Sequence, residues 1–492
     1  MTFAWALFVV YLIGTAWLGW QGFRKTTGFG SFALGNRAMH PLVVGITLAA
    51  SVSSAATFII NPGFVYVDGF GAFFHMSIAV GVGFIVMLSI LSFRFRQIGA
   101  DSGALTIPDW IGKRYKSKGF ALYFSILNLL SFAFVVLLVG GISIVMQSLL
   151  GISNQLALSI TLVFVTGYVF IGGTYAHVLT NMLQGSLMIF VTVLVVGSCV
   201  WLAMQQPGST VDALRAVDPN LVAAVNTEGN LFNSFYSIYI AGFVVGAIVV
   251  CQPHILTKAL YVKDDRDVRY YLIVFTVVFF LFQMLGLVGF FTHLTVPPEA
   301  LVDAASGQFR QDLVMTEYLK AMFPPWVFTV VSVVLLAAAM STLDGLLVSM
   351  STITANDLVL NLAERRQHHS EEQQMAFALK VSHIVLVVIA VAAFLINLQP
   401  PRLLGIFGQT GVYGLTAAAA PPLLLGVLFN RVPVALVWVG SAAALLIHFG
   451  LFFKGAALFP TSTFTFANPG VTASLATLIV MPVLLIAAAV KR

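Results

Sequence analysis

Oxygen-bearing residues inside otherwise apolar stretches are the groups in this sequence best suited to chemistry. Ser341 and Thr342 are adjacent hydroxyls within residues 337–345, and a second hydroxyl-rich stretch at residues 49–57 runs into Asn-Pro-Gly at 61–63. Proline donates no backbone hydrogen bond and glycine weakens a helix, so this stretch is expected to interrupt a helix and free backbone carbonyls. Hard cations such as sodium prefer oxygen ligands, so the two stretches predict a cation site. The alternatives are close helix packing and hydrogen bonds within the helices.

A second interruption is expected where Pro253 stands between Gln252 and His254, in the middle of another apolar stretch. The two interruptions lie five predicted helices apart, and an odd number of crossings inverts the second copy of a repeat. Interruptions at matching positions of two halves indicate an inverted repeat that holds solute and ions between its broken helices. Pro253 alone is at least as well explained as a tolerated kink, so the inference depends on its pairing with the first stretch.

Two ionisable groups lie within apolar stretches, where such groups are costly and therefore functional candidates. Asp344 follows Ser341 by three residues on the same helical face, and it is expected to serve a second sodium ion, a proton or a structural hydrogen bond. His75 could hydrogen-bond a solute, titrate near neutrality or simply bond a backbone carbonyl as a neutral ring. The spacing of His75, His254 and Asp344 gives no catalytic or metal-ligand constellation, so an enzyme is not predicted.

The composition excludes a soluble globular protein. Of the 492 residues, 59% are hydrophobic and only 9% are charged, and a soluble fold could not bury so much apolar surface. The formal net charge is +6, but the basic residues fall in short loops without an interleaved aromatic patch, so no nucleic-acid partner is expected. Cys199 and Cys251 lie in apolar stretches and are expected to be buried thiols. The sequence therefore predicts an all-α polytopic membrane protein embedded in a lipid bilayer.

Apolar runs long enough to cross a bilayer predict about 13 transmembrane helices. They are expected at residues 3–22, 39–66, 71–93, 119–150, 155–174, 178–204, 233–261, 270–294, 325–358, 374–397, 402–429, 432–453 and 469–490. With this layout, 19 of the 24 lysines and arginines fall on one side. An excess of basic residues marks the cytoplasmic side, so the N-terminus is predicted outside and the C-terminus inside, in a cell inner membrane.

Four motifs make the sequence resemble the solute:sodium symporter family. They are Leu-Gly-Asn-Arg at 34–37, the stretch from Ser54 to Pro-Gly at 62–63, Gln-Pro-His-Ile at 252–255 and Ala-Met-Ser-Thr-Leu at 339–343. The motifs are spread along the chain, and the sequence is most similar in character to the bacterial proline and pantothenate permeases of that family. The resemblance implies an inverted five-helix repeat like that of the bacterial leucine transporter, formed by the second to eleventh helices.

The resemblance also implies a division of the chain. Residues 1–37 would form a peripheral helix and a cytoplasmic loop, 38–205 the first half of the repeat, 206–430 an external loop with the second half, and 431–492 two further peripheral helices.

A sodium site is a further implication of the resemblance. The main sodium site of the family maps onto the carbonyls of Ala50, Ser53 and Ala338 and the hydroxyls of Ser341 and Thr342.

One departure from the family pattern concerns a carboxylate near this site. Many relatives carry an aspartate where this sequence has Asn181, and usually a small polar residue at the position of Asp344. The carboxylate thus lies on a different helix here. Asp344 and Asn181 form either a possible second cation site or a structural hydrogen bond, and the stoichiometry of coupling stays open.

The solute is expected between the second, third, seventh and eleventh helices. The candidate binding residues are Ser53, Ser54, Thr57, His75, Gln252, His254, Gln409 and Tyr413. No arginine occurs within residues 119–150, which disfavours a strongly acidic sugar acid, whereas the positive ends of broken helices suit a small polar or monocarboxylate solute. Lys258 matches a basic position of the family and is expected near the cytoplasmic end of its helix, as a gate-side charge or a snorkelling anchor.

The sequence therefore predicts a secondary active symporter. Sodium would enter together with a small organic solute, such as an amino acid, a pantothenate-like compound or a monocarboxylate, by alternating access around one midplane site. The alternatives are proton coupling in the same fold, or a membrane sensor that binds the solute without transporting it.

Overall fold

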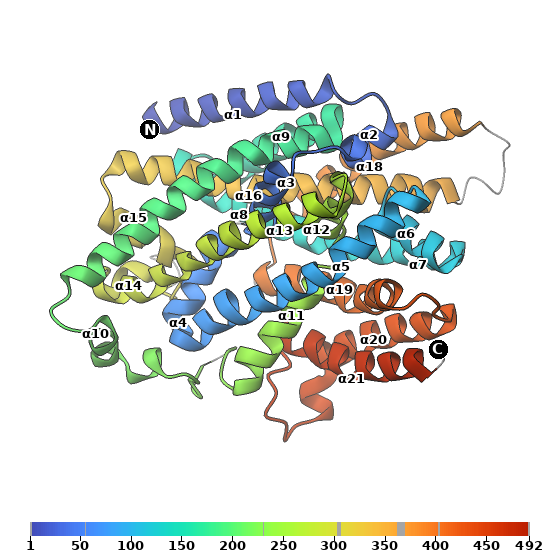
Figure 1. Ribbon diagram of the computed structural model, residues 1–492. Coiled ribbons are helices and arrows are strands. Elements are labelled where there is room, and N and C mark those ends of the chain that lie inside the picture. Colours follow the sequence, from blue (N-terminus) through green and yellow to red (C-terminus); the bar gives the residue numbers. More distant parts are fainter. Residues whose placement is uncertain are drawn as a thin grey trace.

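The structure is a computed structural model that describes residues 2–54, 56–229, 231–302, 307–361, 370–401 and 404–490. Within these ranges the regular elements are helices, and the β-structure is a single isolated bridge between Val302 and Phe309. Long helices lie broadly alongside one another, with α1 (Thr2–Phe23) along one margin and α20 (Val434–Leu458) and α21 (Pro469–Val490) along the opposite one (Figure 1). The predicted all-α architecture is confirmed.

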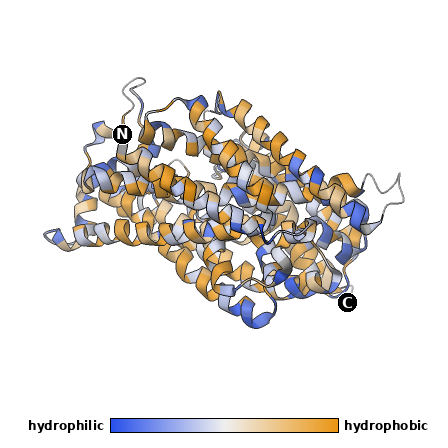
Figure 2. Ribbon diagram, turned by 90° about the horizontal axis from the view of Figure 1, so that it is seen from above, coloured by the Kyte–Doolittle hydropathy of each residue, from blue (hydrophilic) through white to orange (hydrophobic). Residues whose placement is uncertain are grey.

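The other long helices follow the apolar stretches of the sequence. They are α5 (Val80–Ser102), α7 (Lys118–Leu127) continued by α8 (Phe132–Leu150), α9 (Asn154–Gln205), α13 (Asp265–Gln283) continued by α14 (Leu287–Thr295), α16 (Pro325–Ile353), α18 (Glu371–Asn397) and α19 (Leu404–Leu428). Apolar residues line most of the helix lengths, and hydrophilic ones gather mostly near the helix ends and connections (Figure 2). This distribution is the one that a bilayer requires, because its interior offers no water to polar side chains.

The described residues contain ten helices that are long and apolar enough to cross a membrane, or eleven with one bent pair. Two of the ten, Ala56–Ser102 with 47 residues and Asn154–Gln205 with 52 residues, are longer than the roughly 20 residues that one crossing needs. Each contains a glycine at which two helices join, Gly69 (φ 61°) and Gly173 (φ 50°). The predicted count of 13 spans stays a prediction.

These two glycines are required by both conformation and space. Positive φ is disfavoured for residues with a side chain, and a Cβ built on Gly69 would lie 2.3 Å from the carbonyl oxygen of Leu221. A Cβ on Gly173 would lie 2.4 Å from the Phe32 ring. The chain therefore changes direction between these helices at glycines, and no other residue could replace them without strain.

The first broken helix consists of α3 (Pro41–Val52), the short π-helix η2 (Ala56–Ile60) and α4 (Asn61–Phe73). The chain leaves helical geometry at Ser53 and Ser54, which we call the first break. The prediction that Asn-Pro-Gly makes the interruption is wrong in its position, because Pro62 lies in the first turn of α4. Proline is tolerated in a first helical turn, where its missing N–H leaves no bond unmade.

The second broken helix consists of η6 (Tyr236–Ile240) with α11 (Ala241–Val249), followed by α12 (Pro253–Leu256) with η7 (Thr257–Tyr261). The two parts are bent by 66° at residues 250–252, which we call the second break. The interruption predicted around Pro253 is confirmed, and Pro253 begins the second part rather than kinking a continuous helix.

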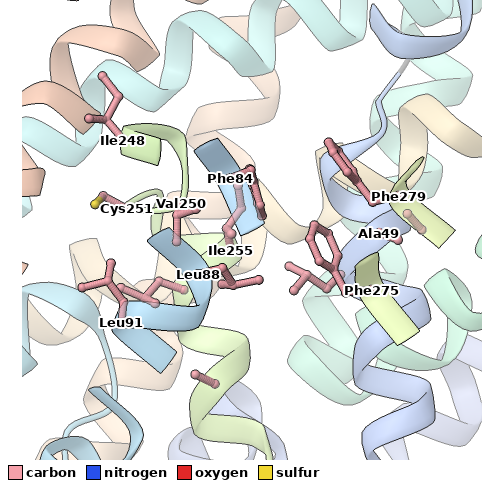
Figure 3. Close-up of a cluster of buried hydrophobic side chains, with 14 of the residues drawn as sticks. Ala49, Phe84, Leu88, Leu91, Ile248, Val250, Cys251, Ile255, Phe275 and Phe279 are labelled. Atoms are coloured by element: carbon pink, nitrogen blue, oxygen red, sulfur yellow. The ribbon is translucent and has the colours of Figure 1, made fainter. Parts of the chain in front are cut away.

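Apolar side chains fix the second broken helix against its neighbours. Val250 and Ile255 lie beside Phe84 and Leu88 of α5 (Figure 3). The ring of Phe84 in turn packs at 5.1 Å from that of Phe275 in α13. All five side chains are buried, so the break sits in a closely packed setting that holds its polar groups in place.

Short helices in the connections complete the fold. They are α2 (Phe29–Leu34), α6 (Ile107–Tyr115), α10 (Thr210–Val217) and α15 (Val314–Met322), together with the π-helix η11 (Thr354–Leu360) that continues α16. The helix α6 was not predicted, although Thr106 with Asp109 three residues later is a typical start signal: the Thr106 hydroxyl accepts the Asp109 N–H at 3.1 Å.

Candidate ion and solute site

The hydroxyls of Ser341 and Thr342 join α16 to the end of α3. Ser341 Oγ lies 2.9 Å from the carbonyl oxygen of Ala50 and 2.7 Å from that of Ala338. Thr342 Oγ1 lies 2.9 Å from the carbonyl oxygen of Ser51. The structure therefore brings together four of the five residues expected to bind sodium, all fully or almost fully buried.

The carbonyl of the fifth expected ligand, Ser53, is not the one that Thr342 contacts. Thr342 contacts the carbonyl of Ser51, two residues earlier. Ser53 lies in the first break and is fully buried, and its own hydroxyl oxygen has no hydrogen-bond partner among the described residues. An isolated buried hydroxyl costs free energy, so this oxygen is suited to an ion or solute.

A lysine ammonium lies beside this group. Lys258 is fully buried, and its Nζ donates to the carbonyl oxygen of Thr47 and to Ser51 Oγ, both at 2.9 Å. Lys258 lies near the end of its helix as expected, because η7 ends at Tyr261. The alternative of a snorkelling anchor is wrong, because the side chain is buried and reaches α3 instead of the membrane surface, and a gate-side charge stays a prediction.

Asn181 connects the same two helices. Its Nδ2 donates to Ser51 Oγ and to the carbonyl oxygen of Ser341, both at 2.9 Å. Its Oδ1 is buried without a hydrogen-bond partner among the described residues. Asn181 thus combines a fixed position with an unused oxygen ligand.

Asp344 is bonded to α9 and not to Asn181. Its Oδ2 accepts from the Tyr168 hydroxyl at 3.0 Å and from Thr180 Oγ1 at 3.2 Å, and its Oδ1 lies 2.8 Å from His177 Nδ1. The expected bond between Asp344 and Asn181 is therefore replaced by three others. Because Tyr168 and Thr180 lie on opposite sides of the Gly173 kink, the carboxylate holds both parts of α9 against α16.

The second break carries polar groups that are less fully paired. Gln252 Nε2 donates to the carbonyl oxygen of Val249 at 3.4 Å, whereas Gln252 Oε1 and His254 Nδ1 are buried without partners among the described residues. His254 lines a cavity of about 20 Å³ with His177 and Gly345, which is room for roughly one water molecule. Buried polar atoms in proteins are nearly always paired, so these groups point to a ligand.

The remaining predicted solute residues are scattered. His75 Nδ1 lies 2.7 Å from the carbonyl oxygen of Ser237, at the far end of the second broken helix from its break. Ser54 Oγ accepts the N–H of Ala56 at 3.2 Å, and Thr57 is buried in η2. Gln409 and Tyr413 are half-buried on α19.

Sequence reasoning missed two residues of this site, Tyr168 and His177, and did not predict that Lys258 contacts α3. A signal was present for His177, which lies four residues before Asn181 and therefore on the same helical face. The signal for Lys258 was its distance of four residues from His254, which puts both on the face of the helix that the second break directs inward.

Comparison with known proteins identifies the class. The profile of the sodium:solute symporter family matches residues 32–437, more than half of the chain, and the chain belongs to that family. It is a multi-span membrane transporter and not an enzyme, and its family is that of the sodium:solute symporters.

Individual relatives are similar over most of their length. The chain is 27% identical to a sodium/pantothenate symporter of Haemophilus influenzae, over 86% of this chain and 84% of that protein. It is also 27% identical to a sodium/proline symporter of Escherichia coli, over 86% of this chain and 82% of that protein. A solved sodium-coupled sialic acid symporter, in a substrate-bound outward-open state, superposes with a TM-score of 0.75 at 16% identity, covering 97% of this chain and 96% of that chain. This last likeness shows the shared fold.

Proposed function

We propose that the chain imports a small organic solute with sodium bound where α3 ends against α16. The observation that carries the proposal is the placement of the Ser341 and Thr342 hydroxyls within 2.9 Å of carbonyl oxygens of α3. Sodium prefers such neutral oxygen ligands. Ala50, Ser53, Ala338, Ser341 and Thr342 would hold the ion.

Coupling would follow from what the ion joins. α3 belongs to the first half of the repeat and α16 to the second, so an ion held by both favours the conformation in which they are close. A solute that binds the same conformation better binds more tightly once sodium is present, and the effect is reciprocal. Ser53 lies in both predicted sites and would link them directly.

The solute would meet the second break. Gln252 Oε1 and His254 Nδ1 are the buried polar atoms without partners there, and Lys258 adds a positive charge nearby. Proline and pantothenate, named for the two relatives, each carry one carboxylate. A small monocarboxylate or amino acid is therefore the solute class that we propose.

A second cation at Asp344 and Asn181 stays a prediction. Both oxygens of Asp344 lie against donors from α9, whereas Asn181 Oδ1 lacks a partner among the described residues. This difference favours one sodium ion per cycle over two. The basic residues at the predicted cytoplasmic ends support an inner-membrane orientation with the N-terminus outside.

Uptake by purified protein in liposomes tests the proposal. Labelled proline, pantothenate and short monocarboxylates would be offered first under a sodium gradient, and then under a proton gradient without sodium. We expect accumulation of one of these solutes with sodium only, and a sodium Hill coefficient near 1. Accumulation driven by protons alone would favour the proton-coupled alternative. Tight binding of a solute that never accumulates would favour a sensor.

A further inference from the structure

Two pockets are lined by residues at the start of α6 and along it. The first, which we call the inner cavity, is the one lined by His177 and His254, and it extends to Ser349 and Thr106. The second, which we call the outer pocket, has about 450 Å³. Its lining includes Asp109, Lys113, Lys116, Ser117, Lys118 and Asp357.

One hydrogen bond joins a residue that lines the inner cavity to a residue that lines the outer pocket. Thr106 Oγ1 donates to Asp357 Oδ2 at 2.5 Å. Thr106 lines the inner cavity and Asp357 lines the outer pocket, and each residue is only 2% exposed. A path from one pocket to the other therefore passes the place where these two side chains meet.

The bond joins two parts of the molecule that are otherwise anchored separately. Thr106 caps α6, which is held to α19 because the Tyr115 hydroxyl donates to the carbonyl oxygen of Pro422 at 2.6 Å and Arg114 Nε to that of Gly426 at 2.9 Å. Asp357 lies in η11, the π-helical end of α16. π-Helical turns are local departures from the α-helix that occur frequently at functional sites. The bond therefore connects α19, through α6, with α16.

Asp357 has no part in the ion site, and yet it is a buried carboxylate. Its side-chain partners are the Thr106 hydroxyl and Asn356 Nδ2, the latter at 2.9 Å. Burial of a carboxylate is costly unless its hydrogen bonds compensate. A bond whose loss leaves a buried carboxyl group without its hydroxyl partner, beside a pocket wide enough to admit water, is suited to two states: closed and dry, or open and wet.

We propose that Thr106 and Asp357 form the cytoplasmic gate of the transport path. In this proposal, which rests on the proposed function, the solute passes from the second break into the inner cavity and leaves through the outer pocket when the bond opens. The outer pocket is lined by three lysines and two aspartates, with Lys113 paired to Asp109 at 2.9 Å, and this polar lining suits the water that an opened path admits.

A cysteine in the inner cavity can report the opening directly. Ser349→Cys is nearly isosteric and lies on the cavity wall, and Cys199→Ala and Cys251→Ala remove the two natural thiols. The rate of labelling by a membrane-impermeant maleimide would be measured in inside-out and right-side-out vesicles. Because accessibility is the readout, the test needs no knowledge of the solute, and the gate is tested apart from transport.

Asp357→Leu removes the acceptor and leaves the Thr106 cap of α6 intact. The loss of a buried hydrogen bond changes an equilibrium enough that we expect the thiol introduced by Ser349→Cys to be labelled about tenfold faster from the cytoplasmic side. Asp357→Asn, which keeps the shape and an acceptor oxygen, should give a smaller increase. Thr106→Ser, which keeps the hydroxyl, should label like the parent.

Thr354→Val is the matched control. Thr354 lies in the same π-helix, and its buried hydroxyl has no hydrogen-bond partner among the described residues, so its loss should leave labelling unchanged. Equal labelling rates in Asp357→Leu, Asp357→Asn and the parent, with all three proteins monodisperse on gel filtration, would overturn the gate. So would acceleration seen only from the opposite face of the membrane. Such a result would leave the proposed function untouched, because sodium-driven uptake in liposomes is measured separately.

Discussion

The two breaks differ in how many contacts hold the polar groups beside them. Next to the first break, Ser51 of α3 receives hydrogen bonds from Asn181, Lys258 and Thr342, which come from three different helices, and Ser53 Oγ in the break itself has no partner among the described residues. At the second break, Gln252 Oε1 and His254 Nδ1 have no partners among the described residues. The first break is thus a fixed set of oxygens, which suits a small spherical ion. The second has unused donors and acceptors, which suit a solute with directional hydrogen bonds.

The difference has a physical cause in the residues that face each break. α16 presents two adjacent hydroxyls to α3, and the hydrogen of each hydroxyl can rotate to meet a carbonyl oxygen. Apolar side chains of α5, among them Phe84 and Leu88, lie beside the second break instead (Figure 3), and they cannot pair its polar groups. Both breaks therefore offer unpaired polar atoms, and the first differs in also having a set of oxygens held in place by hydrogen bonds between helices.

The largest expected effect is at the first break. Thr342→Val keeps the shape of the side chain and removes its oxygen, so the sodium concentration for half-maximal uptake should rise by about tenfold or more, as expected when a charge-binding ligand is lost. Sodium-dependent uptake in liposomes measures it. Ser332→Ala removes a hydroxyl elsewhere on α16 that bonds only its own helix at 2.8 Å, and should have no effect. Unchanged sodium dependence in Thr342→Val would place the ion elsewhere.

At the second break the opposite pattern is expected. Gln252→Leu removes the unpaired Oε1, so solute affinity should fall by roughly tenfold because one hydrogen bond to the solute is lost. Sodium binding, measured by calorimetry without solute, should stay within about twofold. A loss of sodium binding as large as the loss of solute binding would show that the two breaks do not divide the work as proposed.

The side chain of Lys258 connects the two breaks, because it reaches from the second broken helix to the residues beside the first break. Its ammonium lies on Ser51, whose carbonyl oxygen Thr342 also contacts, so it repels a sodium ion bound there. Lys258→Met keeps the length of the side chain without the charge, and should lower the half-saturating sodium concentration by about fivefold. Lys258→Arg keeps the charge and serves as the control. Weaker sodium binding in Lys258→Met would mean that the ammonium positions the site more than it opposes the ion.

The sequence was sufficient to predict the class of fold and the two hydroxyls at the centre of the site. Ser341 and Thr342 were singled out together with the hydroxyl-rich stretch at 49–57, although other adjacent hydroxyls of α16, Ser351 and Thr352, bond their own helix. The proline at 253 indicated a broken helix. Both signals depend on residue types that lie close together in the sequence, so the sequence is enough to find them.

What could not be predicted depends on contacts across the fold. Lys258 contacts α3 through a buried ammonium, which its place in the sequence does not reveal. A bond between Asp344 and Asn181 was one of three alternatives, and the carboxylate instead contacts Tyr168, His177 and Thr180. The first break lies inside the stretch that the sequence marked, at Ser53 and Ser54 rather than at Asn-Pro-Gly, because Pro62 fits a helix start as well as a helix end.

The smallest effect is expected at His75, which the sequence placed among the solute ligands. Its Nδ1 bonds the Ser237 carbonyl oxygen and its ring packs at 4.6 Å from that of Phe232, so it holds the start of the second broken helix to α4 and its continuation. His75→Asn places an amide N–H near the position of Nδ1 and should change solute affinity by less than about twofold. His75→Leu leaves that buried carbonyl without its donor, at a cost of about 1–3 kcal/mol in the free energy of unfolding, and should lower the melting temperature while solute affinity stays the same. A tenfold loss of solute affinity in both variants would instead extend the solute site from the second break to the outer end of its helix, and the division of ion and solute between the two breaks would no longer describe where the solute binds.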